Sequence, residues 1–285
     1  MNLGDFLKQA GEVPRQTRIR IAARRLEISE ALVLAKQDMV LSDETKTVMQ
    51  QDFADLANGR PEAYVLGDIP FLDYSFLIDQ RALIPRPETE DLCARVIKRC
   101  QHNPPLDVLD LCCGSGVMGL SMGLSFPKSR ILLTDLSRGA LSLCEENIRY
   151  SGMGDRAGVS LGDLWEAVPG NRQFDLIVAN PPYVALEDEV ETSVLVNEPH
   201  LALYSDDGGM AHIKRIIKQL PEKLRPGGLA AFELGHEHSS FLTPWLEARD
   251  DYQNFGWERD LFGVSRFLFY DCPIASCGTQ GKEGE

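Results

Sequence analysis

Short apolar runs and stretches with helical spacing alternate along the last two thirds of the chain. Residues 174–179, FDLIVA, form a mostly apolar run with β-branched residues at its centre, which predicts a buried strand. Similar runs are LDVLDL, RILLTD, AGVSLGD, GGLAAFEL and RFLFYD. Helical spacing falls between them, at residues 117–126, 137–152 and 209–224. The alternation predicts an α/β fold whose mostly parallel sheet is covered by helices on both faces.

The first third of the chain has a different pattern. Residues 1–58 place apolar side chains at mixed steps of three and four, which predicts a small helical domain. Residues 59–89 combine turn residues with short apolar runs, which predicts a linker containing one or two β-hairpins. The α/β domain then spans residues 90–272, and the small, polar tail at 273–285 is predicted to be disordered.

Five arginines crowd one end of the helical region. They are Arg15, Arg18, Arg20, Arg24 and Arg25. Two interpretations fit such a cluster: a solvated helix face, or a patch that faces RNA or the ribosome.

Composition and charge narrow the class of protein. The 285 residues are 44% hydrophobic and 25% charged, as in an ordinary globular protein. A formal charge of −14 argues against a dedicated DNA-binding protein and favours a basic protein partner. No run is long and apolar enough for a membrane span or a signal peptide, and seven scattered cysteines are typical of reduced thiols. We therefore expect a cytoplasmic protein without a membrane partner.

A glycine-rich stretch follows one predicted strand and opens a helix. Gly114, Gly116 and Gly119 fit the pattern G-x-G-x-x-G, which lets the backbone approach a ligand at a helix N-terminus. Asp110 ends the strand before this loop, and Asp135 ends the next strand, 19 residues after Gly116. An acid at that place can accept hydrogen bonds from both hydroxyls of a ribose. The pair predicts a nucleoside-bearing cofactor; the alternative is an ordinary glycine turn with an unrelated strand-end acid.

The strand at 174–179 ends in Asn180, Pro181, Pro182 and Tyr183. An amide nitrogen is a weak nucleophile with two N–H donors, and two acceptors held in its plane would orient it. The Asn180 oxygen and the Pro181 carbonyl can be those acceptors, because the prolines fix the backbone that aims them. Tyr183 can stack on the flat amide and exclude water. The alternative is a strand-ending turn with a capping asparagine.

Together these motifs resemble the class I S-adenosylmethionine (SAM) methyltransferases that carry Asn-Pro-Pro-Tyr. More narrowly, the sequence resembles the glutamine methyltransferases of peptide-chain release factors. Four stretches carry that likeness: GRPEAYVLG (59–67), LIPRPETE (83–90), ANPPYV (179–184) and NEPHLAL (197–203). The Asn-Pro-Pro-Tyr motif is shared with adenine methyltransferases, whereas LIPRPETE is much more specific.

The resemblance implies a Rossmann-like class I methyltransferase fold, with a mostly parallel seven-stranded sheet behind a helical N-terminal domain that grips the substrate. It implies transfer of a methyl group from SAM, which becomes S-adenosylhomocysteine, to the glutamine of a Gly-Gly-Gln motif in a translation release factor. No metal is expected, because the five histidines lack ligand spacing. The expected catalytic residues are Asn180, Pro181, Pro182 and Tyr183. The expected cofactor-binding residues are Asp110, Cys112, Cys113, Gly114, Ser115, Gly116, Asp135, Asp163, Leu164 and Asn180. Arg86, Pro87, Glu88 and Glu198 are expected near the substrate mouth.

The chain departs from the family pattern at the start of the glycine loop. Cys112 and Cys113 stand where the family usually has Gly-Thr. This leaves three alternatives open: methylation of a ribosomal-protein glutamine, methylation of an adenine amino group in DNA or RNA, and a non-catalytic SAM-binding partner protein. Seven acids and no Lys or Arg between 184 and 210 argue against bringing a DNA backbone to the site.

Overall fold

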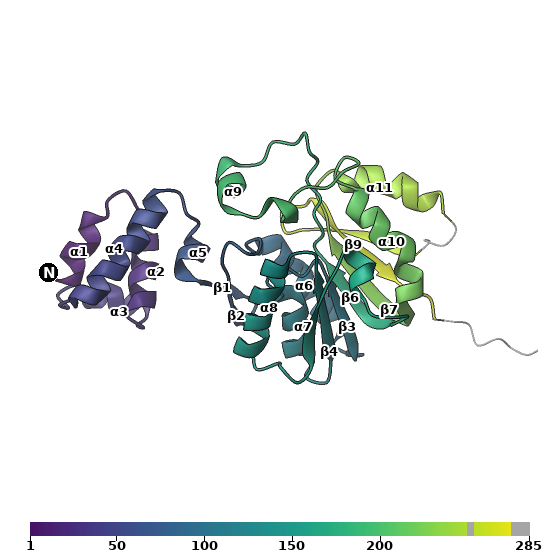
Figure 1. Cartoon of the computed structure of the whole chain (residues 1–285), viewed down its shortest axis with the longest axis horizontal. Coiled ribbons are helices and arrows are strands. Elements are labelled where there is room, and N and C mark those ends of the chain that lie inside the picture. The colour runs from purple at the N-terminus through teal and green to yellow at the C-terminus, as the bar shows by residue number, and fades with distance from the viewer. Residues whose placement is uncertain (250–253, 275–285) are drawn as a thin grey trace, which may run out of the picture.

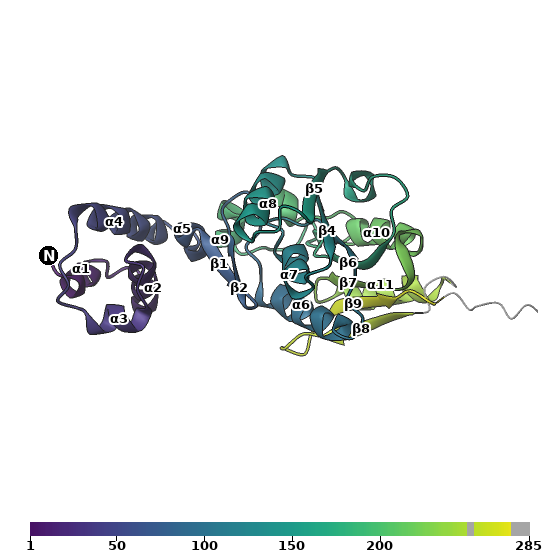
Figure 2. The ribbon, with the colours of Figure 1, turned by 90° about the horizontal axis from the view of Figure 1, so that it is seen from below.

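The computed structural model describes residues 1–249 and 254–274 (Figure 1). A helical N-terminal unit lies at one end of the molecule and a larger unit built around a sheet at the other (Figures 1 and 2). Residues 275–285, which make up most of the predicted disordered tail, lie outside the described residues.

Four helices form the N-terminal unit and share one apolar core: α1 (Leu3–Gln9), α2 (Arg15–Arg25), α3 (Glu30–Ala35) and α4 (Asp43–Ala57). Ser29 and Ser42 cap α3 and α4, because each hydroxyl accepts a hydrogen bond from a backbone N–H in the first turn. A short helix, α5 (Glu62–Leu66), leads to a single hairpin of β1 (Asp68–Phe71) and β2 (Tyr74–Leu77). The hairpin therefore connects the helical unit to the sheet.

The arginine cluster on α2 forms internal contacts. Arg20 donates to Glu62 of α5 at 2.7 Å, Arg24 lies 3.3 Å from Asp68 of β1, and Arg25 donates to Asp52 of α4 at 2.7 Å. Arg18 donates to the Leu7 carbonyl. Four of the five arginines therefore fasten α2 to the helices and strand around it, while Arg15, Arg20 and Arg24 are also exposed, as the solvated-face interpretation expects.

The larger unit is a seven-stranded sheet in the order β5-β4-β3-β6-β7-β9-β8. Its strands are β3 (Asp107–Leu111), β4 (Arg130–Asp135), β5 (Ala157–Leu161), β6 (Phe174–Ala179), β7 (Leu224–Glu233), β8 (Phe255–Arg259) and β9 (Ser265–Asp271). The pairs among β3 to β7 are parallel, while β9 pairs antiparallel with both β7 and β8. The predicted α/β class is confirmed, and β8 is a strand that the sequence pattern did not predict.

Helices cover both faces of this sheet. α6 (Pro87–Cys100), α7 (Val117–Ser125) and α8 (Arg138–Tyr150) pack on one face. α10 (Ala211–Lys223), α11 (His238–Glu247) and the 3-10 turn η1 (Leu164–Ala167) pack on the other. The central strand β6 shows why its sequence is apolar throughout: Leu176 and Val178 face the first core, while Ile177 and Ala179 face the second.

The strand order reverses between β3 and β6, which creates a crevice beyond their carboxyl ends. The glycine loop after β3 and the Asn-Pro-Pro-Tyr segment after β6 both open onto it. A long excursion follows Tyr183 and contains α9 (Thr192–Asn197) and the 3-10 turn η2 (His200–Ala202). We call residues 184–203 the strap; it is closed at its base where Val184 accepts from Ser205 N at 2.8 Å and donates to Leu203 O at 2.9 Å.

Candidate active site

A cavity lies at the crevice between β3 and β6; it opens to solvent, and its empty space including the open mouth is about 1010 Å³. Its walls come from the linker, the glycine loop, the end of β4, the turn after β5, the Asn-Pro-Pro-Tyr segment and the strap. The predicted site residues that line it are Cys112, Cys113, Gly114, Ser115, Asp135, Asp163, Leu164, Asn180 and Pro182. The sheet topology thus gathers motifs from four separate parts of the chain around one ligand-sized space.

The glycine loop turns sharply over the end of β3. Cys112, Gly114 and Gly116 all have positive φ angles, of 57°, 55° and 84°. A left-handed conformation is unusual for cysteine, so the position where the family usually has glycine keeps the glycine-like backbone. At Gly116 a side chain is also excluded by space, because a Cβ would lie 2.6 Å from the Cys144 Sγ. The loop therefore presents its backbone to the cavity at the N-terminus of α7.

Asp110 and Gly116 lie behind the loop and do not line the cavity. The Asp110 carboxylate is fully buried and accepts a hydrogen bond from Gly119 N at 2.8 Å. Burial raises the pKa of Asp110 to about 7, against the lowering effect of that backbone donor. Asp110 therefore holds the first turn of α7 in place, and a direct contact with the cofactor stays a prediction.

Asp135 stands at the end of β4 and lines the cavity. Its Oδ2 accepts from Gly114 N at 2.9 Å, and its Oδ1 accepts from Ser137 N at 2.8 Å. Burial raises the pKa of Asp135, and the backbone donors act in the opposite direction. Each carboxylate oxygen has a second lone pair, so both can still accept from a ligand hydroxyl.

The opposite wall is formed at the turn after β5. Leu164 is buried and has a φ of 49°, a second non-glycine residue in the left-handed region at this cavity. Asp163 pairs with Arg215 of α10 at 2.7 Å, so one of its oxygens already has a cationic partner. This wall combines an apolar surface with one carboxylate.

The Asn-Pro-Pro-Tyr segment is only partly exposed to the cavity. Asn180 and Pro182 line it, whereas Pro181 is buried and does not. Asn180 Nδ2 donates to the Thr89 hydroxyl at 3.3 Å, which turns the nitrogen end of the amide toward α6. Tyr183 does not line the cavity; its ring packs edge-on against His238 with centroids 6.0 Å apart. Burial raises the pKa of the Tyr183 hydroxyl above its usual value.

The expected mouth residues divide into two groups. Glu198 is a buried residue of the strap, and it accepts from Arg86 Nη2 at 2.7 Å and from Ile84 N at 2.9 Å. These bonds join the strap to LIPRPETE and hold Pro199 and Leu201 against the cavity. Pro87 and Glu88 start α6 and do not line the cavity. A proline in the first turn followed by an acid is a favourable helix start.

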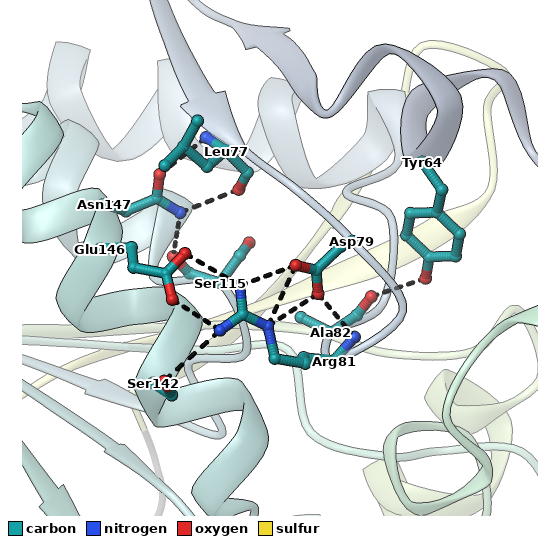
Figure 3. Close-up of polar contacts among 9 residues, drawn as sticks. All are labelled: Tyr64, Leu77, Asp79, Arg81, Ala82, Ser115, Ser142, Glu146 and Asn147. Carbon is teal, nitrogen blue, oxygen red and sulfur yellow. Dashed lines mark hydrogen bonds and ion pairs between the residues drawn. The ribbon is translucent and has the colours of Figure 1, made fainter. Parts of the chain in front are cut away.

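The linker is fastened to the glycine loop by residues that carry no motif (Figure 3). The fully buried Asn147 of α8 accepts from Leu77 N at 2.7 Å and donates to Ser115 O at 2.9 Å. Arg81 bridges Asp79 and Glu146, with bonds of 2.7 Å to each (Figure 3). Hydrogen bonding and charge from both carboxylates raise the pKa of Arg81. The hairpin exit and the cofactor loop are therefore braced through α8.

Within residues 1–249 and 254–274, no group of three or more His, Cys, Asp or Glu side chains is arranged to hold a metal ion. No helix in the same ranges has the length and apolar character needed to cross a bilayer.

Comparison with known proteins connects this geometry to a family. The family described as methyltransferase small domain matches residues 91–210. A release factor glutamine methyltransferase from Bordetella pertussis is 33% identical over 265 residues, 93% of this chain and 97% of that protein. One from Koribacter versatilis is 32% identical and covers 85% of this chain and 86% of that protein.

A solved structure shares the fold at low sequence identity. The catalytic domain of hMettl16, in complex with MAT2A 3'UTR hairpin 1, has a TM-score of 0.54 and 14% identity, and covers 85% of this chain and 87% of that chain. The class I methyltransferase fold predicted from the sequence is therefore confirmed. With the Bordetella protein 33% identical along nearly the whole of both chains, this protein belongs to the release factor glutamine methyltransferase family.

Proposed function

We propose that this enzyme transfers a methyl group from SAM to the side-chain amide nitrogen of a glutamine in a translation release factor, within a Gly-Gly-Gln motif. Family membership supports the reaction and the substrate. The orientation of Asn180 is the structural observation that carries the proposal. Since its nitrogen donates to Thr89, its oxygen is left to accept from a substrate N–H.

The cavity fits the cofactor that the family uses. Asp135 would accept from the ribose hydroxyls, and the glycine-loop backbone would lie against the rest of the molecule. Leu164 offers an apolar surface to the adenine ring, with Asp163 beside it. SAM supplies an electrophilic methyl group on a sulfonium. Transfer breaks that S–C bond, forms an N–C bond and releases a neutral thioether and one amide proton.

The chain's own residues would position the nucleophile. Asn180 Oδ1 and the Pro181 carbonyl would each accept one N–H of the substrate amide, which holds the nitrogen in line with the methyl group. Tyr183 would order the segment from behind through its contact with His238, in place of the stacking on the amide that the sequence suggested. We propose the helical unit at residues 1–58 as the part that grips the partner, and the cytoplasm as the place of reaction.

The acidic strap favours a protein substrate over a nucleic acid. Glu187, Asp188 and Glu189 are exposed beside the segment that carries Asn180. A phosphate backbone would be repelled there, whereas a basic loop on a protein would be attracted.

The direct test uses purified protein, purified release factor and isotopically labelled SAM. We expect one methyl group on the glutamine of the Gly-Gly-Gln motif, located by mass spectrometry of the tryptic peptide. A release factor with that glutamine changed to alanine is the control and should remain unlabelled. Label that enters a ribosomal protein or RNA in a cell extract, with none in the release factor, would contradict the proposal.

A further inference from the structure

A buried carboxyl group lies directly behind Asn180. In the parallel register of β6 and β7, Ala179 pairs with Phe232, so the next residues, Asn180 and Glu233, stand side by side at the edge of the cavity. Glu233 is only 1% exposed. Its Oε2 has no hydrogen-bond partner among the described residues, which is costly for a buried acceptor.

The surroundings of Glu233 come from three elements. From α6, Thr89 is a hydrogen-bonding neighbour, Glu88 adds negative charge, and the buried Cys93 lies within electrostatic range. From β9, Arg266 adds positive charge, although its Nε donates to Asp260 at 2.8 Å.

The third element is the end of β6. Asn180 acts to lower the pKa of Glu233, and the charge of Glu233 acts to raise the pKa of Tyr183. No cation therefore forms a direct pair with Glu233 in the described chain.

We propose that Glu233, together with Thr89, is a positioning residue that fixes the rotamer of the Asn180 amide. An inference of this kind rests on the proposed function, because it assigns the Asn180 oxygen to the substrate. An ionised Glu233 only accepts hydrogen bonds, so it favours Thr89 as its O–H donor, and the Thr89 oxygen is then left to accept from the nitrogen end of Asn180. Flipping the amide would set its oxygen against the carboxylate and turn an N–H toward the N–H groups of the substrate.

Protonation of Glu233 removes the preference for one rotamer of the Asn180 amide. A neutral carboxyl can donate to an amide oxygen, so both rotamers of Asn180 become acceptable. Burial raises the pKa of Glu233 from 4.5 to about 7, with Thr89 and Asn180 acting to lower it. Glu233 therefore fixes the rotamer of Asn180 above about pH 7, and this effect is lost as the pH falls through that value.

The test compares kcat for E233Q and wild type at saturating SAM and release factor, from about pH 5.5 to about pH 9. Wild-type kcat should fall about tenfold per pH unit below the Glu233 pKa. Glutamine can donate as well as accept at every pH. The kcat of E233Q should therefore be about ten- to a hundredfold lower than that of wild type at high pH, and it should lack the fall of kcat below the Glu233 pKa, which we call the low-pH limb. SAM affinity should stay within about twofold, because Glu233 does not line the cavity.

The matched control is E247Q, the same change at an exposed position on α11. Its kcat at high pH and the fall of its kcat at low pH should both match wild type. Wild-type activity without a limb near pH 7, E233Q as fast as wild type, or a limb that persists in E233Q would each overturn the inference. A lower rate with an unchanged limb would mean that Glu233 has a structural role only.

E233Q should remain folded. The raised pKa means that the folded protein holds this proton more tightly than the unfolded chain. The stability from Glu233 is therefore present below about pH 4.5 and is lost as the pH rises through about 7. Above that pH the uncharged glutamine should give a melting temperature no lower than wild type.

A measurement without turnover separates this inference from the proposed substrate. The side-chain amide signal of Asn180 in a ¹⁵N NMR spectrum, assigned by its loss in N180D, should shift with a midpoint near the Glu233 pKa in wild type and not in E233Q. An Asn180 signal that does not titrate would overturn the inference even if methyl transfer is found. A titrating signal without transfer to any release factor would contradict the proposed function alone.

Discussion

Individual side chains in this protein have separate roles around one cavity. Asp135 stabilises the glycine loop by accepting from Gly114 and Ser137, and it faces the space proposed for the ribose. Asn180 faces the space proposed for the substrate amide. Cys112 holds a left-handed backbone that costs an L-residue about 1–2 kcal/mol, which gives a physical reason for the glycine usual in the family.

Replacing Asn180 by alanine should abolish transfer without abolishing cofactor binding. The variant loses one of the two acceptors that orient the nucleophile, so kcat should fall by about a hundredfold or more. SAM affinity measured by calorimetric titration should remain, because the glycine loop and Asp135 are untouched. A folded N180A protein that no longer binds SAM would move Asn180 to the cofactor site.

Replacing Asp135 by alanine should have the opposite effect. Loss of the carboxylate leaves the ribose hydroxyls and the N–H of Gly114 without an acceptor, which should weaken SAM binding by about 1–3 kcal/mol. The control is D135N, which retains one acceptor oxygen and should have intermediate affinity. Unchanged affinity of D135A in calorimetric titration would exclude the ribose assignment.

At the scale of elements, the strap and the linker meet above the cavity through Glu198. The carboxylate receives one bond from the Arg86 side chain and one from the Ile84 backbone, and both donors come from the linker. Within the strap, α9 contributes no buried residue, and the buried apolar residues Ala185 and Leu203 lie near its two ends. The middle of the strap is held to the linker by the Glu198 contact and by a bond from Asn197 Nδ2 to Gly59 O at 3.1 Å.

Changing Glu198 to glutamine should loosen the strap. Glutamine can still accept from Ile84 N, but it removes the charge that holds Arg86, a guanidinium about one third exposed at 33%. We expect the contact between strap and linker to lose about 1 kcal/mol of interaction free energy, a small value because solvent screens the partly exposed Arg86. SAM release in stopped-flow measurements should be about fivefold faster. E187Q, on the exposed part of the same strap, should release SAM at the wild-type rate. Equal release rates for E198Q and wild type would show that the strap does not limit exchange.

At the scale of the whole molecule, the charge and the two-unit architecture favour a protein partner. The net charge is −14, and the strap beside Asn180 carries several exposed carboxylates. The helical unit extends away from the sheet (Figures 1 and 2) and is fastened to the connecting hairpin by Arg24 of α2. A partner that contacts both units would meet acidic groups near the cavity.

Salt should therefore slow protein methylation. The kcat/KM for release factor should fall by roughly tenfold as salt is raised to about 0.5 M, because screening weakens the attraction between the strap and a basic loop. Transfer to adenine-containing DNA should be negligible, and most strongly suppressed at low salt. SAM affinity is the control and should change little. Efficient methylation of bare DNA at low salt, or protein methylation that accelerates with salt, would contradict this account.

Local patterns in the sequence were sufficient for most of the elements and for the motifs. The apolar run at 174–179 predicted β6, because a strand buried on both faces needs no polar alternation. The glycine spacing predicted the loop at the start of α7. Asp135, picked out by its position at a strand end, lines the cavity, and its bond to the ribose stays a prediction. Strand β8 was missed because its residues FGWER carry no continuous apolar signal.

Only the tertiary structure decided which side chains support the site. Asn147 meets Leu77 across 70 positions and Arg86 meets Glu198 across 112, and nothing in the local spacing of these residues indicates a partner. Glu233 lies beside Asn180 because β6 and β7 are neighbours in register, which depends on how the whole sheet is ordered. The surroundings of Asp110 also depend on the tertiary structure. Its sequence position suggested a ligand contact, but α7 folds over it and leaves it buried. Periodicity is a property of neighbouring residues, so the sequence by itself determined the elements, whereas the contacts between distant strand ends arise only when the sheet assembles.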